Sequence, residues 1–501
     1  MRNLENIHVR KIRRTYDKEA GKFTFRISYE TTAQLTPRSL VVAEAFGLGI
    51  EDRKFKILDT ELTIGPKDIV YICGDSGSGK SVLLRAIKSD LKSEAIDLSE
   101  IIIQEDKPLI ETIGNTVEEG LQLLSEVGLN DAFLFLRTYD QLSDGQKYRY
   151  RIAKLIETDK QWWLMDEFCA TLDRDTAKII AFNLQKIARQ RGKAAIVATT
   201  HEDLLEDLAP SVHVIKRLGE EIHATYFTNT PRTSCSLLQE MKIEPGTLDD
   251  WKKLSMFHYR GHNLGARRGI FTIKRQNHLC GIIIYCYPPP RCAGRRLKLR
   301  PKNLDYLNKE LCTISRIVIH PKFRSIGLAQ KLIRETLPLI GTTYVEMVAV
   351  MPLYNPFAER AGMEKVTFNP PSKEAVKISW SLNALGFSSE LLSSDRYVRD
   401  KLETLPDTDI EQIRQAFTRH PHPRFKRASE GHHCSPYGNT KLYRQALAKA
   451  NIDLWAKLIK IVAVLLQAKV YLFWKRPEDN SPDTNTPPWP PDEHLLKTVN
   501  S

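Results

Sequence analysis

Short apolar runs alternate with longer amphipathic patterns over most of this 501-residue chain. From Val41 to about Thr228 the apolar runs have the length of strands, and helical patterns separate them. This alternation predicts an α/β domain with a largely parallel sheet. A second α/β block runs from about Leu237 to Leu382, and a mostly helical region follows it. We therefore expect a multidomain α/β protein with a mainly helical C-terminal region.

Polar and turn-forming residues mark the boundaries between these blocks. The segment Asn229–Ser236 contains Pro231 and small polar residues, which are typical of a linker. The tail from Pro477 is proline-rich, a composition that predicts disorder. The chain is thus expected to contain a basic strand-rich segment (1–40), an α/β domain (41–228), a linker (229–236), a second α/β domain (237–382), a mainly helical region (383–476) and a tail (477–501).

A glycine-rich loop in the first α/β domain joins a continuously apolar strand, Ile69–Cys73, to a helix. Glycines allow backbone N–H groups to surround phosphate, and the helix N-terminus adds the positive end of its dipole. Lys80 is expected to reach the β- and γ-phosphates, and the Ser81 hydroxyl to bind Mg²⁺. The loop has the pattern G-x-x-x-x-G-K-S and consists of Gly74, Asp75, Ser76, Gly77, Ser78, Gly79, Lys80 and Ser81.

Two further apolar strands of this domain end in residues suited to nucleotide hydrolysis. Trp162–Met165 precedes Asp166 and Glu167, and a later strand ends at His201. Asp166 is placed to hold Mg²⁺ and Glu167 to polarise an attacking water. His201 is expected to sense or hold the γ-phosphate. Two acids that merely cap a strand are the structural alternative for the pair alone, and the second strand with its histidine weighs against it.

These motifs, together with others, give the domain a resemblance to ABC ATPases. Leu142–Gln146 resembles the LSGGQ signature, and Ala170–Asp173 resembles the D-loop. Gln104 falls at the place of the Q-loop glutamine, and His201 matches the switch histidine. Phe46 is a candidate for the aromatic residue that stacks on adenine. The elements occur in the family order, which makes the match specific.

The resemblance implies a domain that binds ATP and Mg²⁺, hydrolyses ATP, and forms an ATP-dependent head-to-tail homodimer. In such a dimer the signature of one protomer closes on the nucleotide held by the other. One departure is Asp144, which stands at the signature's first glycine and would repel γ-phosphate unless its carboxylate points away. The residues implied at the nucleotide outside the glycine-rich loop are Gln104, Ser143, Gly145, Gln146 and Asp173, and those implied at the metal are Ser81, Gln104 and Asp166.

A second strand–turn–helix unit occurs in the second α/β domain. Thr313–Ile319 alternates like a strand, and an amphipathic helix follows a turn of small residues. Backbone N–H groups at such a turn can surround a diphosphate. The turn resembles the R/Q-x-x-G-x-G/A acetyl-CoA motif of GNAT acyltransferases, and it consists of Arg324, Ser325, Ile326, Gly327, Leu328 and Ala329.

Flanking segments extend the resemblance to the GNAT family. Cys280–Tyr285 is similar to the family's hairpin, Tyr344–Val348 to its next strand, and Asn355–Met363 to its closing segment. The order of domains resembles a family of predicted ABC-ATPase–acetyltransferase fusions. The resemblance implies acetyl-CoA as cofactor, held by the turn and by Ile317 and Ile319, and direct attack of an acceptor amine on the thioester carbonyl.

The sequence offers several candidates for the catalytic acid and base of this second site. The family's tyrosine falls at Ala358, so Tyr354 is a candidate acid for the CoA thiolate, with a packed aromatic as the alternative. Glu346 is the first candidate for the general base, although a glutamate on a strand could equally be a structural hydrogen-bonding residue. His258 and His262 are the next candidates.

Charge and composition bear on partners and location. The net charge of +13 favours a polyanion such as nucleic acid, with a solvated basic surface as the alternative. The basic run Arg291–Lys302 is either a phosphate contact or a solvated loop. The eight cysteines contain no CxxC pair, which is typical of a cytoplasmic protein with reduced thiols. The segments His420–His422 and His432–Cys434 offer metal-ligand types without an established spacing.

These features support two hypotheses of different classes. The first is an ATP-gated acetyl-CoA-dependent N-acyltransferase that acts on nucleic acid, either tRNA or DNA. The second is a nucleic-acid-binding ABC ATPase of the repair or chromosome type with a non-catalytic CoA-binding domain. A protein N-acetyltransferase is a third alternative. No apolar stretch has the roughly 20 residues that a spanning helix needs, so we expect no membrane domain and a cytoplasmic location.

Overall fold

The computed structural model describes residues 7–31, 36–48, 53–219, 222–258, 264–350, 355–429 and 439–477. The chain divides into two compact units. The first comprises Met1–His262, Phe271–Ile282 and Val318–Leu332, and the second comprises Asn263–Ile270, Ile283–Ile317 and Ile333–Ser501. The predicted disorder of the tail concerns residues 478–501, which lie outside the described residues.

The strands are β1 (Ile7–Asp17), β2 (Lys22–Thr31), β3 (Arg53–Thr63), β4 (Ile69–Cys73), β5 (Ala95–Asp97), β6 (Trp162–Met165), β7 (Ala194–Ala198), β8 (Val212–Lys216), β9 (Ile222–Tyr226), β10 (Met241–Pro245), β11 (Arg267–Arg275), β12 (His278–Cys286), β13 (Leu311–Ile319), β14 (Tyr344–Ala349), β15 (Glu364–Asn369) and β16 (Lys469–Lys475). The helices are α1 (Pro37–Ala45), α2 (Lys80–Leu91), α3 (Val117–Glu126), α4 (Ala132–Phe135), α5 (Asp144–Glu157), α6 (Arg174–Arg191), α7 (Leu205–Leu208), α8 (Leu248–Ser255), α9 (Leu304–Glu310), α10 (Leu328–Thr336), α11 (Lys373–Ala384), α12 (Asp395–Thr404), α13 (Asp407–Arg419), α14 (Pro423–Ser429), α15 (Thr440–Ala448) and α16 (Ile452–Leu465).

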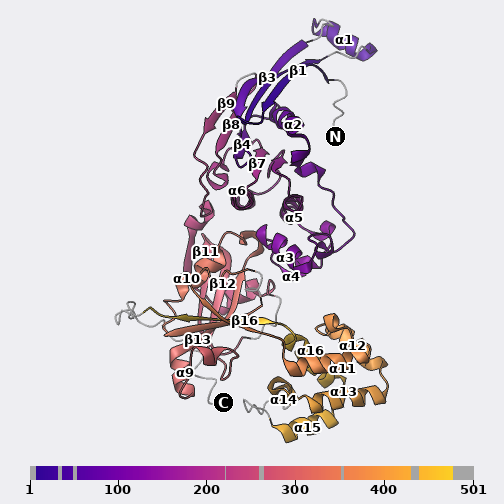
Figure 1. Ribbon diagram of the computed structural model, residues 1–501, viewed down its shortest axis with the longest axis vertical. Coiled ribbons are helices and arrows are strands. Elements are labelled where there is room, and N and C mark those ends of the chain that lie inside the picture. The colour runs from indigo at the N-terminus through magenta and orange to yellow at the C-terminus, as the bar shows by residue number, and fades with distance from the viewer. Residues whose placement is uncertain are drawn as a thin grey trace. The chain divides into compact units, whose positions relative to one another are not determined.

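A six-stranded sheet organises the first α/β domain (Figure 1). Its order is β5-β6-β7-β4-β8-β9, with every pair parallel except β8–β9. Successive residues of a strand point to opposite faces, so Tyr71 and Trp163 enter one hydrophobic core with α3, α5 and α6. Val70 and Trp162 enter the core on the other face with α2. The predicted, largely parallel α/β domain is confirmed.

A three-stranded antiparallel sheet, β1-β2-β3, lies against that second face. Phe23 and Phe25 of β2 and Leu58 of β3 are fully or almost fully buried in the same core as Val70 and Leu83. The boundary predicted at residue 40 is therefore wrong, because β1 and β2 pair with a strand beyond it and share a core with the parallel sheet. Apolar alternation identified the strands but carried no information about their partner.

A seven-stranded mixed sheet has the order β10-β11-β12-β13-β14-β16-β15. β13 and β14 pair in parallel, and β16 pairs antiparallel with both β14 and β15. The parallel pairing covers only Leu311–Thr313 against Tyr344–Glu346, although both strands continue beyond it. From Ile314 onward β13 therefore separates from β14, and the two strands form a wedge that opens toward their carboxyl ends.

Helices α11 to α16 enclose a core of their own between β15 and β16. Trp455, Leu458 and Val462 of α16 are buried in that core, so the apolar stripe of this helix packs against the other helices. Within the region 383–476, which the sequence predicts to be mainly helical, residues 469–475 form the strand β16 instead. The described helices include none that is both long enough and apolar enough to cross a membrane.

Candidate functional site

Three neighbouring parallel strands place the predicted hydrolysis residues at one edge of the six-stranded sheet. β6, β7 and β4 are adjacent, and their carboxyl ends lead into Asp166, Thr199 and Gly74 respectively. Backbone hydrogen bonds join the carboxyl ends of these strands, from Phe168 N to Ala198 O at 2.8 Å and from Thr199 N to Ile72 O at 3.0 Å. The carboxyl edge of a parallel sheet is where such folds bind ligands.

The glycine-rich loop has the backbone that a phosphate cradle requires. Gly74, Gly77 and Gly79 have φ of 133°, 76° and 100°, a region that other residues rarely adopt. The Ser78 Oγ is buried and has no hydrogen-bond partner among the described residues. An unpaired buried hydroxyl is costly, and a phosphate oxygen would supply its partner. The loop therefore fits the triphosphate of ATP.

Lys80 begins α2, and its ammonium donates to the carbonyl oxygens of Gly74 at 2.8 Å and Asp75 at 2.6 Å. Burial lowers the pKa of Lys80, opposed by the charges of Asp166 and Asp75. The ammonium is thus held inside the loop, at the place from which a lysine of this motif neutralises phosphate. Ser81 follows it in the first turn of α2 and is half-buried.

Substitution of Gly74 by alanine is expected to remove ATP binding and to lower the free energy of unfolding by about 2 kcal/mol. A Cβ at Gly74 would lie 2.0 Å from the Lys216 carbonyl oxygen, which cannot move without disturbing β8. Gly77→Ala is the matched control, because Gly77 also has a left-handed φ, of 76°, but no heavy atom of the described residues lies within 4 Å of a Cβ there. Thermal unfolding and ATP titration of both variants test this; equal stability of the two would contradict it.

The two carboxylates predicted to act in hydrolysis, Asp166 and Glu167, follow β6 in a strained turn. Glu167 is exposed and has φ of 48°, and its N–H donates to the Asp166 carboxylate at 3.0 Å. Asp166 is half-buried, whereas Glu167 is exposed. His201 N–H donates to Thr199 Oγ1 at 3.3 Å, and the Tyr71 hydroxyl donates to the His201 carbonyl oxygen. These contacts fix the backbone of His201 and leave its imidazole half-buried.

The signature residues begin α5. Ser143 is the exposed N-cap, and its N–H donates to the Gln146 side chain at 3.0 Å in a capping box. A Cβ on Gly145 would lie 3.3 Å from the Thr176 methyl group, so this glycine approaches α6 closely. Asp144 is exposed in the first turn, where a carboxylate stabilises the helix dipole. That position gives the unexpected aspartate a structural reason.

The D-loop leads into α6, for which Asp173 is the N-cap. Its carboxylate accepts hydrogen bonds from Thr176 N at 3.2 Å and Thr176 Oγ1 at 2.6 Å. The next residue, Arg174, pairs with Asp203 and so ties α6 to the segment after His201. Gln104 is exposed beyond β5, and Phe46 follows α1 with 75% of its side chain exposed. Among the described residues, no hydrogen bond or ion pair joins Gln104 or Phe46 to the glycine-rich loop.

The parallel sheet, the glycine-rich loop and the carboxylates at its edge define an ATP-hydrolysing domain of the ABC class. Residues 57–170 match the family model for the ABC transporter, so the chain contains an ABC transporter-type ATPase domain. The chain is 31% identical over 184 residues to the methionine import ATP-binding protein MetN 1 of Lactiplantibacillus plantarum, which covers 29% of this chain and 51% of that protein. It therefore spans about half the length of this relative.

Two other comparisons concern the same part of the chain. The phosphonates import ATP-binding protein PhnC of Hyphomonas neptunium is 26% identical over 226 residues, which is 37% of this chain and 84% of that protein. Among solved structures, the dimeric bacterial ABC transporter cassette MJ0796 is 19% identical, with a TM-score of 0.30, over 35% of this chain and 93% of that one.

Glu346, the predicted general base, lies on β14 of the seven-stranded sheet and forms a buried ion pair with Arg295. Its carboxylate is fully buried and accepts from Arg295 Nε at 2.9 Å and Arg295 Nη2 at 2.6 Å. Thr313 Oγ1 at 2.9 Å and the Tyr471 hydroxyl at 3.0 Å complete its hydrogen bonds. A base needs a free oxygen that an acceptor can reach, so this position does not fit that role. The structural alternative for Glu346 fits instead.

The remaining predicted residues of the second site are placed only in part. Ile317 and Ile319 are half-buried on β13, and the buried Val318 between them points to the other face. In the turn that follows, Ser325 and Gly327 have φ of 73° and 91°, while Ile326 and Leu328 are buried. Ala358 is fully buried. Tyr354, His262 and the segment His432–Cys434 lie outside the described residues, and the described part of the chain holds no group of three metal-ligating side chains.

Several polar residues of the site carried no sequence signal. Arg217 pairs with Asp75 at 3.4 Å and with Glu202 at 3.2 Å, so it bridges the glycine-rich loop to the segment after His201. Lys322 contacts Asp173 of the D-loop at 2.6 Å. These partners are distant in sequence, and a lone arginine or lysine in a basic chain gives no indication of its partner. Only the three-dimensional structure identifies them.

Proposed function

We propose that this chain combines its ABC-type ATPase with an acetyl-CoA-dependent N-acyltransferase that acts on nucleic acid, either tRNA or DNA. ATP binding closes a homodimer across the exposed Ser143 and the half-buried Gly145, and hydrolysis reopens it. The second α/β domain accepts the acyl-CoA, and the ATPase cycle presents or releases the acceptor. The two curated relatives named above are import ATP-binding proteins. We do not assign their substrates to this chain.

The wedge between β13 and β14 is the observation that carries the acyl-CoA proposal. Parallel pairing stops at Thr313 and Glu346, so the backbone of β13 from Ile314 to Ile319 loses its neighbour on that side. Unpaired strand edges take up an extended ligand by hydrogen bonding. The pantetheine arm of coenzyme A is such a ligand, with amides along its length. The chain then continues into the turn Arg324–Ala329 and the N-terminus of α10, and helix N-termini favour anions such as a diphosphate.

Calorimetric titration with coenzyme A tests this proposal, and we expect one binding site per chain. Coenzyme A itself carries an adenine nucleotide, so the glycine-rich loop is a competing site. Lys80→Ala is the control that separates them, since it removes the ammonium that neutralises phosphate in that loop. Retention of coenzyme A binding and loss of ATP binding in this variant is the expected result. Absence of heat from coenzyme A in the wild-type protein would refute the acyltransferase proposal.

A second candidate is an ABC ATPase that binds nucleic acid while its CoA-binding domain catalyses nothing. The closed ion pair of Glu346 and the buried Ala358 at the family's tyrosine position favour this candidate. To separate the two, the protein is incubated with ATP, labelled acetyl-CoA and total nucleic acid, and the nucleosides are analysed by mass spectrometry. A labelled nucleoside supports the transferase. Unlabelled nucleosides, together with ATP-dependent nucleic acid binding, support the second candidate.

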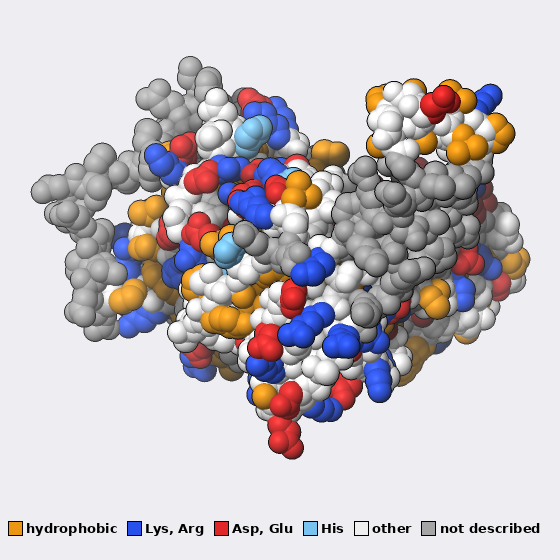
Figure 2. All heavy atoms as spheres, turned by 90° about the horizontal axis from the view of Figure 1, so that it is seen from above, with side chains coloured by type: hydrophobic (Ala, Val, Ile, Leu, Met, Phe, Trp, Pro, Cys, Tyr) orange, Lys and Arg blue, Asp and Glu red, His pale blue; other side chains and the backbone are white. Residues whose placement is uncertain are grey.

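In both candidates, the proposal that the partner is a nucleic acid depends on the charge of the chain. The chain has 74 Lys and Arg residues against 61 Asp and Glu, and Lys and Arg neutralise phosphate backbones. On the face seen in Figure 2 the basic side chains are interspersed with acidic ones, so the excess is not concentrated there. In the predicted basic run, Arg295 is buried against Glu346 and Lys298 pairs with Glu364 at 2.6 Å. These two residues are therefore occupied by carboxylates, and phosphate contact by the run depends on its other members.

A further inference from the structure

Lys322 joins two ATPase elements that carry the signature and the D-loop. It lies in a short 3-10 turn, Pro321–Phe323, that follows β13 and belongs to the same compact unit as the ATPase domain. Its main-chain oxygen accepts from Arg149 Nη2 at 2.9 Å, and Arg149 is on α5, the helix that begins at the signature. Its ammonium pairs with Asp173 Oδ1 at 2.6 Å and Asp175 Oδ2 at 3.2 Å, at the start of α6.

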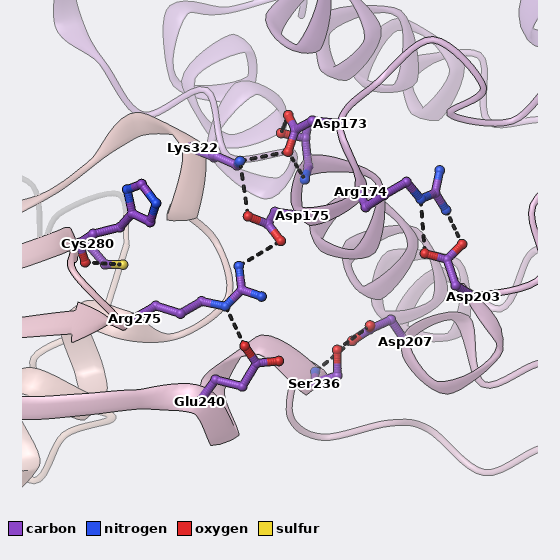
Figure 3. Close-up of polar contacts among 12 residues, drawn as sticks. Asp173, Arg174, Asp175, Asp203, Asp207, Ser236, Glu240, Arg275, Cys280 and Lys322 are labelled. Carbon is purple, nitrogen blue, oxygen red and sulfur yellow. Dashed lines mark hydrogen bonds and ion pairs between the residues drawn. The ribbon is translucent and has the colours of Figure 1, made fainter.

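A series of ion pairs continues from Asp175 to Arg275 of β11 and from there to Glu240 (Figure 3). Arg275 of β11 pairs with Asp175 at 2.8 Å and with Glu240 at 2.6 Å. Lys322 is 30% exposed, Asp175 25% and Arg275 21%, so the central members are partly shielded from solvent and from salt. Partly buried pairs of this kind hold geometry better than isolated surface pairs, which contribute little.

The protonation states agree with this geometry. Burial acts to lower the pKa of Lys322, but its hydrogen bonds with Asp173 and Asp175 outweigh burial and raise that pKa. Burial acts to raise the pKa of Asp173, and the hydrogen bonds from Lys322 and Thr176 outweigh it and lower that pKa. Both groups are therefore charged at neutral pH, and the Asp173 carboxylate is held by three donors.

The residues after Lys322 are attached to the ATPase domain as well. Arg324 pairs with Asp131, the N-cap of α4, at 3.4 Å. Ser325 Oγ accepts from Asn183 Nδ2 of α6 at 2.6 Å. A Cβ on Gly128 would lie 2.6 Å from Ser325 Oγ, so only glycine leaves room for this contact. The segment from Lys322 to Ser325 is thus fixed to α4, α5 and α6 by separate contacts.

We propose that Lys322 is a positioning residue for ATP hydrolysis. Asp173 ends the loop that starts at Asp166 and Glu167, and two residues of that loop, Glu167 and Cys169, have left-handed φ of 48° and 54°. Such a backbone persists only where its ends are held. Lys322 holds the D-loop end by neutralising Asp173 and Asp175, and it thereby fixes Glu167 relative to the glycine-rich loop.

One consequence rests on the proposed function. Lys322 is two residues before the turn Arg324–Ala329, so a ligand that orders this turn changes the position of Asp173 and hence the rate of ATP hydrolysis. Linkage requires the reverse effect, in which the nucleotide state changes the affinity of the turn for its ligand. The turn and the D-loop would then be two ends of one regulated segment.

The test is steady-state ATP hydrolysis by the full chain with Lys322→Met, Lys322→Arg and Lys274→Met. Lys274 is the matched control because it lies on β11, pairs with Glu244 at 3.3 Å, and is 27% exposed. Lys322→Met should lower kcat about 5- to 10-fold and change KM for ATP less than about 2-fold, since the phosphate loop is intact. Lys322→Arg should restore kcat to within about 2-fold of wild type, because it keeps the charge. Lys274→Met should match wild type.

The other outcomes decide against the proposal. An unchanged kcat in Lys322→Met overturns it, and so does a parallel loss of kcat, ATP binding and thermal stability, which indicates a structural role only. Coenzyme A is then added to the wild-type protein and to Lys322→Met. A rate change confined to the wild type supports the regulated segment. If calorimetry detects no coenzyme A binding while Lys322→Met still lowers kcat, the acyltransferase proposal fails and the positioning role stands.

Discussion

Replacement of Glu346 by alanine is expected to lower the free energy of unfolding by about 3–5 kcal/mol, because it leaves an unpaired guanidinium in the core. Glu346 is fully buried and Arg295 is 3% exposed, so neither charge has access to water. The loss also removes the acceptor of the Thr313 and Tyr471 hydroxyl groups. Burial acts to lower the pKa of Arg295, but Glu346 outweighs it and raises that pKa. The substitution removes this compensation, and an arginine guanidinium does not deprotonate in proteins, so a charge is left in the core.

Chemical denaturation of Glu346→Ala measures this loss. Glu364→Ala is the matched control, since Glu364 of β15 in the same sheet pairs with Lys298 at 2.6 Å but is 59% exposed. Exposed pairs contribute at most about 1 kcal/mol, so the control should unfold close to wild type. A Glu346→Ala protein that is as stable as the control would reject the structural role. If it also lost acyl transfer, the general-base hypothesis would return.

Glu167→Gln should lower ATP hydrolysis by about 100-fold or more while ATP still binds, because the amide cannot accept a proton from the attacking water. The substitution preserves the shape of the side chain, and Glu167 is exposed beside Asp166, so the fold has no reason to change. A phosphate-release assay measures the rate of hydrolysis, and nucleotide titration measures ATP binding separately. The ATP-bound variant should also accumulate as a dimer in size-exclusion chromatography with ATP, if the signature closes in trans.

Glu206→Gln is the control for this experiment. Glu206 pairs with Arg232 on the surface of the same domain, is 54% exposed, and lies outside the carboxyl edge of the sheet. It should hydrolyse ATP at the wild-type rate. Hydrolysis by Glu167→Gln within a few-fold of wild type would remove Glu167 from its assigned role and would direct attention to His201.

The ATPase site was predictable from the sequence because its chemistry is local. The glycine-rich loop lies within eight consecutive residues, and Asp166 and Glu167 directly follow an apolar strand. Parallel pairing of the strands is then enough to bring their carboxyl ends, and the residues that follow them, to one edge of the sheet. Most strands and helices of the two α/β domains were predictable for the same reason, since strand burial imposes continuous apolar runs and helix burial imposes its own period.

The features that the sequence did not indicate depend on distant partners. Glu346 has the same local pattern as a catalytic or a structural glutamate, and only Arg295 and Tyr471 distinguish them. Lys322 likewise gains its role from Asp173, which is far away along the chain. The residues of β16 fall in the region that the sequence predicts to be mainly helical, because Val470, Leu472 and Phe473 continue the apolar character of the preceding segment. Short apolar runs of this kind are ambiguous between helix and strand.

The position of β16 has a consequence for synthesis of the protein on the ribosome. This strand lies between β14 and β15 in the sheet, yet it is translated after the whole helical segment α11–α16. During elongation, β14 and β15 therefore wait with open edges, and the carboxylate of Glu346 waits for the Tyr471 hydroxyl. Exposed strand edges favour misassembly, and domains completed early fold first. The nascent strands β1–β9 can close their sheets well before this point, so we expect the seven-stranded sheet to be the part of the molecule that depends most on chaperones during folding.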